Sequence, residues 1–273
     1  MKKAKLFWLV VLLAVVGLPM GAMAQQFQSC DQWATYSNGG YTVYNNIWGS
    51  GAGSQCLWAN SYKNWGVNAN HPNTGGVKAY PNVSKDLSIN VDSLGSCTSS
   101  FNVTRPSSGA YCTAYDIWYA NNAYEIMLWM NKTGAVGPLG SKQTTATIGG
   151  HTWDIYKGSN GANQVFSFVR TSNTNSGTVD IKAISSWLRS NNWFGNVALN
   201  KIQFGFEITS SAGGMAFTCN DYSLSYTQGS SGSSSSSSST SSTSSSSGGC
   251  NSTSSSSTSS TSSTSSTSSS GCN

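Results

Sequence analysis

The sequence predicts an all-β fold: a jelly-roll sandwich of two antiparallel sheets, with a concave cleft and one short helix. Two observations support this prediction. Short segments in which apolar and polar residues alternate recur throughout residues 25–228. Clusters of Gly, Asn, Ser and Pro separate these segments, at a spacing typical of sandwiches and jelly rolls.

The expected strands share two-residue alternation, which places successive side chains on opposite faces of a sheet. In chain order they are residues 41–48, 87–94, 99–103, 115–120, 124–130, 145–148, 151–158, 164–171, 201–208 and 221–227. Residues 180–191 differ, because Ile181, Ile184 and Leu188 repeat at helical spacing. Residues 176–180 offer a helix start, so we expect one short helix packed on the sandwich.

Both ends of the chain differ in composition from this central domain. Three lysines lie in the first five residues, residues 6–18 are uncharged and apolar, and Ala22 to Ala24 forms a small-x-small site. The apolar run is too short to span a bilayer as a helix, so residues 1–24 are predicted to be a secretory signal peptide cleaved before Gln25. The protein is therefore expected to be secreted.

Residues 229–273 consist almost entirely of Ser, Thr and Gly and are predicted to be a disordered linker or tail. Linkers of this kind usually join two modules, so a second module missing after the linker is one interpretation, and a separate use of the tail is another. Cys250 and Cys272 could close a small disulfide loop, or could have no role. Residues 25–228 remain as one domain.

Charge and cysteine usage exclude several kinds of partner. Fourteen Lys and Arg minus the three of the signal leave eleven, against nine acids. No basic cluster remains, so neither nucleic acid nor membrane is expected as a partner. The seven cysteines contain no C-x-x-C motif, and His71 and His151 stand far apart in sequence, so no metal site is expected.

The chain has only two glutamates, and both lie within predicted strands. Alternation places Glu125 on one strand face with Met127 and Trp129, opposite a face of plainly buried residues. In the same way Glu207 shares a face with Gln203 and Gly205. The strand at residues 114–120 carries Asp116 and Trp118 on one face. All three acids therefore project from strands whose other face supplies the core.

Two carboxyl groups on a concave, aromatic-lined sheet face suit glycoside hydrolysis. That reaction needs one carboxylic acid to protonate the leaving oxygen and a second carboxylate to attack or to activate water. Aromatic rings provide platforms for sugar rings, and apolar neighbours raise the pKa of a carboxyl group, as an acid catalyst requires. The plainer alternative is that Glu125 and Glu207 are ordinary solvated residues on outer strand faces.

The domain resembles glycoside hydrolase family 12, the secreted endo-β-1,4-glucanases with a jelly-roll fold. The similar segments are SCDQWATYSNGGYTVYNNIWG, GGVKAYPN, AYDIWY, YEIMLWM, GAVGPLGS and FGFEI, which follow the family's order across nearly all of residues 25–226. The resemblance implies a retaining endo-β-1,4-glucanase that acts on cellulose or mixed-linkage β-glucan. It implies no cofactor, because the reaction uses only water and two carboxyl groups.

The resemblance also implies roles by position. Glu125 matches the nucleophile, Glu207 the acid/base, and Asp116 the aspartate that hydrogen-bonds the nucleophile and tunes its ionisation. Trp48 with Asn46 matches a sugar platform on the non-reducing side, Met127 matches the methionine below the scissile bond, and Trp129 lies on the same strand face. Retention implies carboxyl groups ~5–5.5 Å apart.

The resemblance implies a disulfide between Cys30 and Cys56. Cys97 and Cys112 flank a predicted hairpin, and this spacing alone suggests a second pair. Ile208 departs from members with proline after the acid/base. Residues 56–73 also depart, so Trp58, Trp65 and His71 could line the cleft, although core tryptophans are commoner.

Two alternatives remain for the function of this domain. One is the same enzyme adapted to xyloglucan, which needs a cleft wide enough for xylose branches. The other is a non-catalytic carbohydrate-binding β-sandwich, which would have the aromatic platform without needing paired carboxylates. In each case the expected partner is a β-glucan polysaccharide, and the domain is expected to be a monomer. A second module missing after the linker would then be a carbohydrate-binding module.

Overall fold

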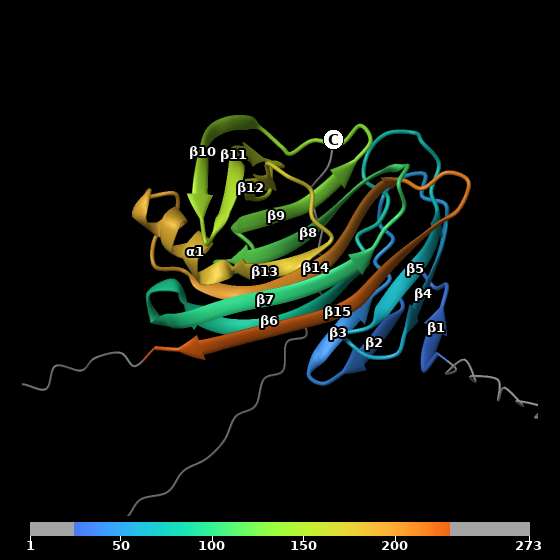
Figure 1. Ribbon diagram of the computed structural model, residues 1–273, viewed down its shortest axis with the longest axis horizontal. Helices are drawn as coiled ribbons and strands as arrows, with labels where there is room; N and C mark the ends of the chain where they lie inside the picture. The colour runs from blue at the N-terminus through green and yellow to red at the C-terminus, as the bar shows by residue number, and fades with distance from the viewer. Residues whose placement is uncertain (1–24, 230–273) are drawn as a thin grey trace, which may run out of the picture.

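The computed structural model describes residues 25–229, which form a sandwich of two sheets and one helix (Figure 1). The sequence-based predictions for residues 1–24, for the tail beyond Gly229, and for Cys250 and Cys272 lie outside these residues. The jelly-roll sandwich is confirmed. Among the described residues, no helix is long and apolar enough to cross a membrane.

The outer sheet has six strands and the inner sheet nine. The outer sheet runs in the order β1 (Phe27–Ser29), β4 (Ser54–Ala59), β5 (Trp65–Asn70), β15 (Met215–Gln228), β7 (Leu94–Thr104) and β13 (Ser176–Asp180). The inner sheet runs in the order β10 (Ser141–Ile148), β11 (His151–Ser159), β12 (Gln164–Arg170), β9 (Tyr124–Thr133), β8 (Ala110–Tyr119), β14 (Ala198–Ser210), β6 (Asn82–Asn90), β3 (Tyr41–Tyr44) and β2 (Thr35–Asn38). A short 3₁₀ helix, η1 (Val91–Ser93), joins β6 to β7.

The main core fills the space between the two sheets. Ile126 and Leu128 of β9 pack there with Phe204 of β14 and with outer-sheet residues such as Phe101. The residues that alternate with these along the strands point to the other face of the inner sheet. There they form a second apolar cluster, which includes Met127 and Trp129. The predicted split of these strands into two faces is thus confirmed, and Figure 1 shows β10 to β12 rising beside this second face.

One pairing departs from the predicted antiparallel sheets. β12 pairs with β9 in parallel, with Val165 opposite Glu125 and Ser167 opposite Met127. The three strands β10, β11 and β12 form an antiparallel meander that follows β9 in the chain. Because neighbouring strands of the meander alternate in direction, β12 runs the same way as β10, and this is also the direction of β9.

The predicted helix is present as α1 (Ile181–Ser190), with Ile181, Ile184 and Leu188 buried. Residues 176–180 are strand β13 rather than part of the helix start, and only Asp180 serves as the N-cap, accepting a hydrogen bond from the Ala183 N–H at 2.8 Å. β13 pairs with β7 along its whole length, and this pairing provides backbone hydrogen bonds as far as the N-cap residue Asp180.

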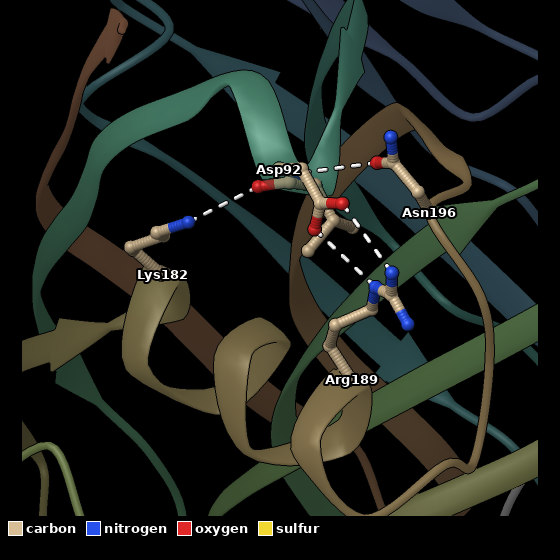
Figure 2. A network of polar contacts seen from close by, with 5 residues as sticks. Asp92, Lys182, Arg189 and Asn196 are labelled. Atoms are coloured by element: carbon tan, nitrogen blue, oxygen red, sulfur yellow. Dashed lines mark hydrogen bonds and ion pairs between the residues drawn. The ribbon is translucent and has the colours of Figure 1, made fainter.

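Polar contacts fasten α1 to the turn at η1 (Figure 2). The Arg189 guanidinium binds the Asp92 carboxylate at 3.3 Å, and the Lys182 ammonium donates to the Val91 carbonyl at 3.0 Å. The Asp92 N–H in turn donates to the Asn196 side chain. These exposed contacts fix the orientation of the helix, while its apolar face provides the burial.

The cysteines follow the predicted pairing only in part. Cys30 and Cys56 form a disulfide, as the resemblance implied. The suggested pair of Cys97 and Cys112 is wrong, because neither cysteine forms a disulfide. Cys97 of β7 faces the core between the sheets, whereas Cys112 of β8 faces the opposite side of the inner sheet. The inner sheet itself therefore separates the two sulfur atoms.

Candidate active site

The three predicted acids project from three adjacent strands, β9, β8 and β14, onto the same face of the inner sheet. In β8, Trp118 lies opposite Glu125, and Cys112 lies opposite Glu207. Asp116 lies between these two positions on β8, with Met127 opposite it on one side and Gln203 on the other. Pleating puts all of these side chains on the face away from the main core.

The face that carries the three acids is otherwise lined mostly by apolar side chains, and the acids themselves are shielded from water. Glu125, Glu207 and Asp116 are all buried, and Met127 and Trp129 belong to the apolar cluster beside them. Met127 and Trp129 thus lie on the same face as the acids, and their contact with a substrate stays a prediction. A buried carboxyl group on an apolar floor is the setting in which its charged form is most costly.

Asp116 shows this effect clearly. Burial, and next the nearby charge of Glu207, raise the pKa of Asp116 well above its usual range, while Lys201 and the Trp118 side chain lower it. Both oxygens of Asp116 lack a hydrogen-bond partner among the described residues by distance and angle. The rise in pKa outweighs the opposing effects, so Asp116 retains its proton in conditions where an exposed aspartate would be ionised.

Tyr80 is a site residue that sequence reasoning did not single out. It is fully buried, and its hydroxyl donates to the Ala114 carbonyl at 3.1 Å. Burial raises the pKa of Tyr80 well above its usual range, and the charges of Asp116 and Glu207 raise it further. Its place in GGVKAYPN, one of the family-like segments, was the available signal.

Gly205 allows the segment that carries Tyr80 to approach β14 closely. A Cβ atom at Gly205 would lie 2.0 Å from the Pro81 carbonyl oxygen, which is an impossible contact. The Phe206 N–H donates to that same oxygen at 3.1 Å. The glycine between Gln203 and Glu207 therefore sets the distance between the floor and the loop beside it.

Asn46 and Trp48 lie in the loop after β3, beside Tyr80. Asn46 has a left-handed backbone, with φ of 46°, and its amide donates to the Tyr80 carbonyl at 3.1 Å. The Tyr80 N–H donates back to the Asn46 carbonyl at 3.0 Å. The Asn46 amide group thus positions the loop, and Trp48 packs against the apolar cluster of the cleft.

Several buried polar atoms on this face have no hydrogen-bond partner among residues 25–229. They are the indole nitrogens of Trp48 and Trp129 and the hydroxyl of Ser167, which lies opposite Met127. Buried polar groups are normally satisfied, and exceptions of this kind are typical of places where a ligand or water binds. Hydroxyl groups of a sugar would provide the missing partners.

The divergent segment 56–73 contributes support rather than a cleft surface. Trp65 and His71 are fully buried, and Trp58 is half-buried against Gly66. The His71 ring accepts from the Gly53 N–H at Nδ1, 3.0 Å away, and pairs through Nε2 with Gln55 at 2.9 Å. His71 also exchanges backbone contacts with Ser211, just beyond Glu207.

The environment of His71 predicts a pH-dependent stability. Burial, and next the charge of Lys78, lower the pKa of His71 from 6.5 to about 4. The unfolded chain therefore binds a proton at higher pH than the folded chain does. We expect stability to fall as the pH drops from about 6.5 towards 4, by about 2 kcal/mol between pH 7 and pH 5 from this residue.

Urea unfolding of the wild type and of His71→Asn at pH 7 and pH 5 measures this difference. The free energy of unfolding of His71→Asn should change less between pH 7 and pH 5 than that of the wild type. His151→Asn, which removes the other histidine from β11, serves as the control and should keep that slope. An equal slope in the wild type and His71→Asn would contradict the assignment.

The described residues contain no group of three or more His, Cys, Asp or Glu side chains that could hold a metal ion. The chemistry available on this face is that of carboxyl groups, a tyrosine hydroxyl, indole rings and amides.

Comparison with known proteins places these features in a family. A model described as glycosyl hydrolase family 12 matches residues 39–227. The probable xyloglucan-specific endo-β-1,4-glucanase A of Aspergillus terreus is 34% identical over 193 residues, covering 62% of this chain and 76% of the relative. The xyloglucan-specific endo-β-1,4-glucanase A of Emericella nidulans is 32% identical over 218 residues, covering 72% and 90%.

Solved structures agree with the sequence relatives. The xyloglucanase domain of NopAA from Sinorhizobium fredii, in complex with cellobiose, superposes with a TM-score of 0.72 at 35% identity, covering 74% of this chain and 100% of that chain. The endoglucanase cel12A from Rhodothermus marinus superposes with a TM-score of 0.68 at 25% identity, covering 74% and 99%.

Proposed function

This chain belongs to glycosyl hydrolase family 12 and is an endo-β-1,4-glucanase, and from this premise we propose that Glu125 and Glu207 carry out its chemistry. The observation that supports the proposal most is the placement of both glutamates and Asp116 on one face of three adjacent strands. The non-catalytic alternative is wrong, because the chain belongs to a family of hydrolases.

The proposed reaction has two steps. The Glu125 carboxylate attacks the anomeric carbon while the Glu207 carboxylic acid protonates the departing oxygen, which gives a glycosyl-enzyme. The Glu207 carboxylate then takes a proton from water, which attacks the same carbon and releases Glu125. Asp116, kept protonated by burial, adds no second negative charge beside Glu125 on the neighbouring strand and so favours the ionised nucleophile.

We infer a substrate-binding role for the aromatic groups beside the acids. Trp48, which is half-buried, offers a ring face for sugar C–H groups, and the buried Trp129 lies in the same apolar cluster as part of the floor. The indole nitrogens of both have no hydrogen-bond partner among residues 25–229. Met127 fills the floor under the scissile bond. The Asn46 amide acts indirectly, by holding the loop that carries Trp48.

Among β-1,4-glucans, branched xyloglucan is the first candidate substrate and linear cellulose or mixed-linkage β-glucan the second. The sequence alone favoured the linear polymers, but the relatives from Aspergillus terreus and Emericella nidulans bear xyloglucan-specific names. Product analysis on xyloglucan, barley β-glucan and carboxymethylcellulose side by side tests this order. Faster cleavage of the linear polymers would reverse it, and no cleavage of any of the three would contradict the proposed function.

We propose further that the enzyme acts outside the cell as a monomer. The basis is the signal-like composition of residues 1–24, together with the disulfide between Cys30 and Cys56, which is typical of oxidising compartments. Residues 25–228 would then form the catalytic domain, followed by the Ser/Thr-rich linker or tail. Mass spectrometry of the protein recovered from the culture medium would identify the mature N-terminus.

A further inference from the structure

A chain of buried hydrogen bonds runs across the floor of the site. The Trp118 indole N–H donates to the Gln203 side-chain oxygen at 2.9 Å, and the Gln203 amide donates to the Asn82 side-chain oxygen at 3.2 Å. The Asn82 amide then donates to the Tyr80 carbonyl at 2.8 Å. Because Asn82 uses its amide nitrogen on Tyr80, its oxygen must face Gln203, and this fixes the Gln203 oxygen towards Trp118.

The indole that this chain restrains lies beside two of the proposed site acids. Trp118 is opposite Glu125 in the β8–β9 register, and it stands on the same face of β8 as Asp116, two residues away. Gln203 lies directly opposite Asp116 in the β8–β14 register. The indole N–H donates to Gln203, and the Trp118 side chain is also near enough to Asp116 to lower the pKa of that carboxyl group.

We propose that Gln203 is a positioning residue that keeps the Trp118 N–H directed away from Asp116, and that it thereby leaves the proton on Asp116 and the charge on Glu125. The inference rests on the proposed function of these acids. Gln203 acts on the acids through Trp118, so its role requires no contact with the substrate.

The chemical reason is a competition for one proton. A donor that turned from Gln203 to Asp116 would stabilise the ionised form of Asp116, as the effect of Trp118 on the pKa of Asp116 already indicates. Asp116 and Glu125 are diagonal neighbours on β8 and β9, because Trp118 lies opposite Glu125 and Asp116 is two residues before it. Two adjacent carboxyl groups titrate as a pair, so ionising Asp116 would shift the remaining proton to Glu125. A protonated Glu125 cannot attack the anomeric carbon.

The same series of hydrogen bonds connects the acids to the loop that carries Trp48. Tyr80 accepts at its carbonyl from both Asn82 and Asn46, and Asn46 precedes Trp48 by two residues. A shift of Gln203 would be transmitted to the loop beside the non-reducing side of the site. Most of the effect should nevertheless appear in kcat, because Trp118 is one link from Gln203 and Trp48 is several links away.

The test is a double-mutant cycle with Gln203→Leu and Trp118→Phe. Gln203→Leu should lower kcat about tenfold, the change that one pK unit of proton redistribution produces, with little change in KM. The acidic limb of its pH profile should move to lower pH, because the carboxyl pair loses its first proton more readily. Trp118→Phe keeps a ring but removes the N–H that lowers the pKa of Asp116, so its acidic limb should move to higher pH, opposite to that of Gln203→Leu.

The double variant decides between a positioning role and a merely structural role. Without the indole N–H, Gln203→Leu has nothing to release, so kcat and the acidic limb should return towards the values of Trp118→Phe. Ser84→Ala, which changes the residue on the other side of Gln203 in β6, is the matched control. Thermal unfolding of every variant checks the fold.

Two outcomes would overturn the inference: an unaltered pH profile in folded Gln203→Leu, or the same shift in the double variant. If the wild-type protein cleaved no β-glucan, the proposed function would fail first. That result is distinguishable, because every comparison in the cycle requires an active wild type.

Discussion

Glu125→Gln should lower kcat on β-glucan by at least about 10⁴-fold while the protein remains folded. The amide is nearly the same size as the carboxylate but carries no negative charge, so no glycosyl-enzyme can form. Glu125 lies on β9 between neighbours whose side chains are fixed by packing, and the change leaves those neighbours in place. The measurement is the initial rate of reducing-sugar release, together with the melting temperature.

Asp221→Asn provides the matched control for Glu125→Gln. It removes one carboxylate charge at an exposed position of β15, in the outer sheet. Its activity should equal that of the wild type. Near-normal activity of folded Glu125→Gln would exclude Glu125 as the nucleophile, whatever the control does.

Glu207→Ala should separate the two steps of the reaction. A dinitrophenyl β-cellobioside has a leaving group that needs no protonation, so this variant should still form the glycosyl-enzyme from it. Hydrolysis of that intermediate should be slow, because no general base activates water. Azide needs no general base, so its addition should restore turnover and yield the β-glycosyl azide.

Glu125→Ala is the natural comparison, because it lacks the nucleophile itself. Any azide product from that variant must arise by direct attack and must have the α configuration. Proton NMR of the two products assigns the anomers. An α-azide from Glu207→Ala, or a β-azide from Glu125→Ala, would show that the two roles are exchanged.

Local periodicity was sufficient to locate the acids. Alternation along β9 and β14 assigned Glu125 and Glu207 to the face opposite Ile126 and Phe204, and the structure has them there. Helical spacing located α1 because Ile181, Ile184 and Leu188 face one way. These assignments need only the geometry of a single element, and the sequence contains that information directly.

Relations between distant segments could not be predicted in this way. The parallel contact of β12 with β9 depends on how many strands the meander inserts, and no local pattern records the outcome. The suggested pairing of Cys97 with Cys112 failed because sequence spacing does not show which face of a sheet each thiol occupies.

The positioning groups were missed for the same reason. Asn82 accepts a hydrogen bond from Gln203, 121 positions later in the chain, through a close approach that Gly205 permits, and the charge of Glu207 acts on Tyr80. Asn46 was expected to contact sugar, which stays a prediction, and its amide also donates to the Tyr80 carbonyl, a contact that no local pattern indicates. Only the folded arrangement shows that this side chain holds the loop.

The position of β15 has a consequence for how this chain is made. The last strand of the described residues lies in the middle of the outer sheet, between β5 and β7, and it pairs Met215 with Ala69, 146 positions earlier (215 − 69). The outer sheet therefore cannot close during synthesis, and until residue 228 is available both β5 and β7 present unpaired edges. Proteins dominated by such distant pairings fold slowly. Any fragment that ends before β15 would keep two open edges, which are templates for association with other chains.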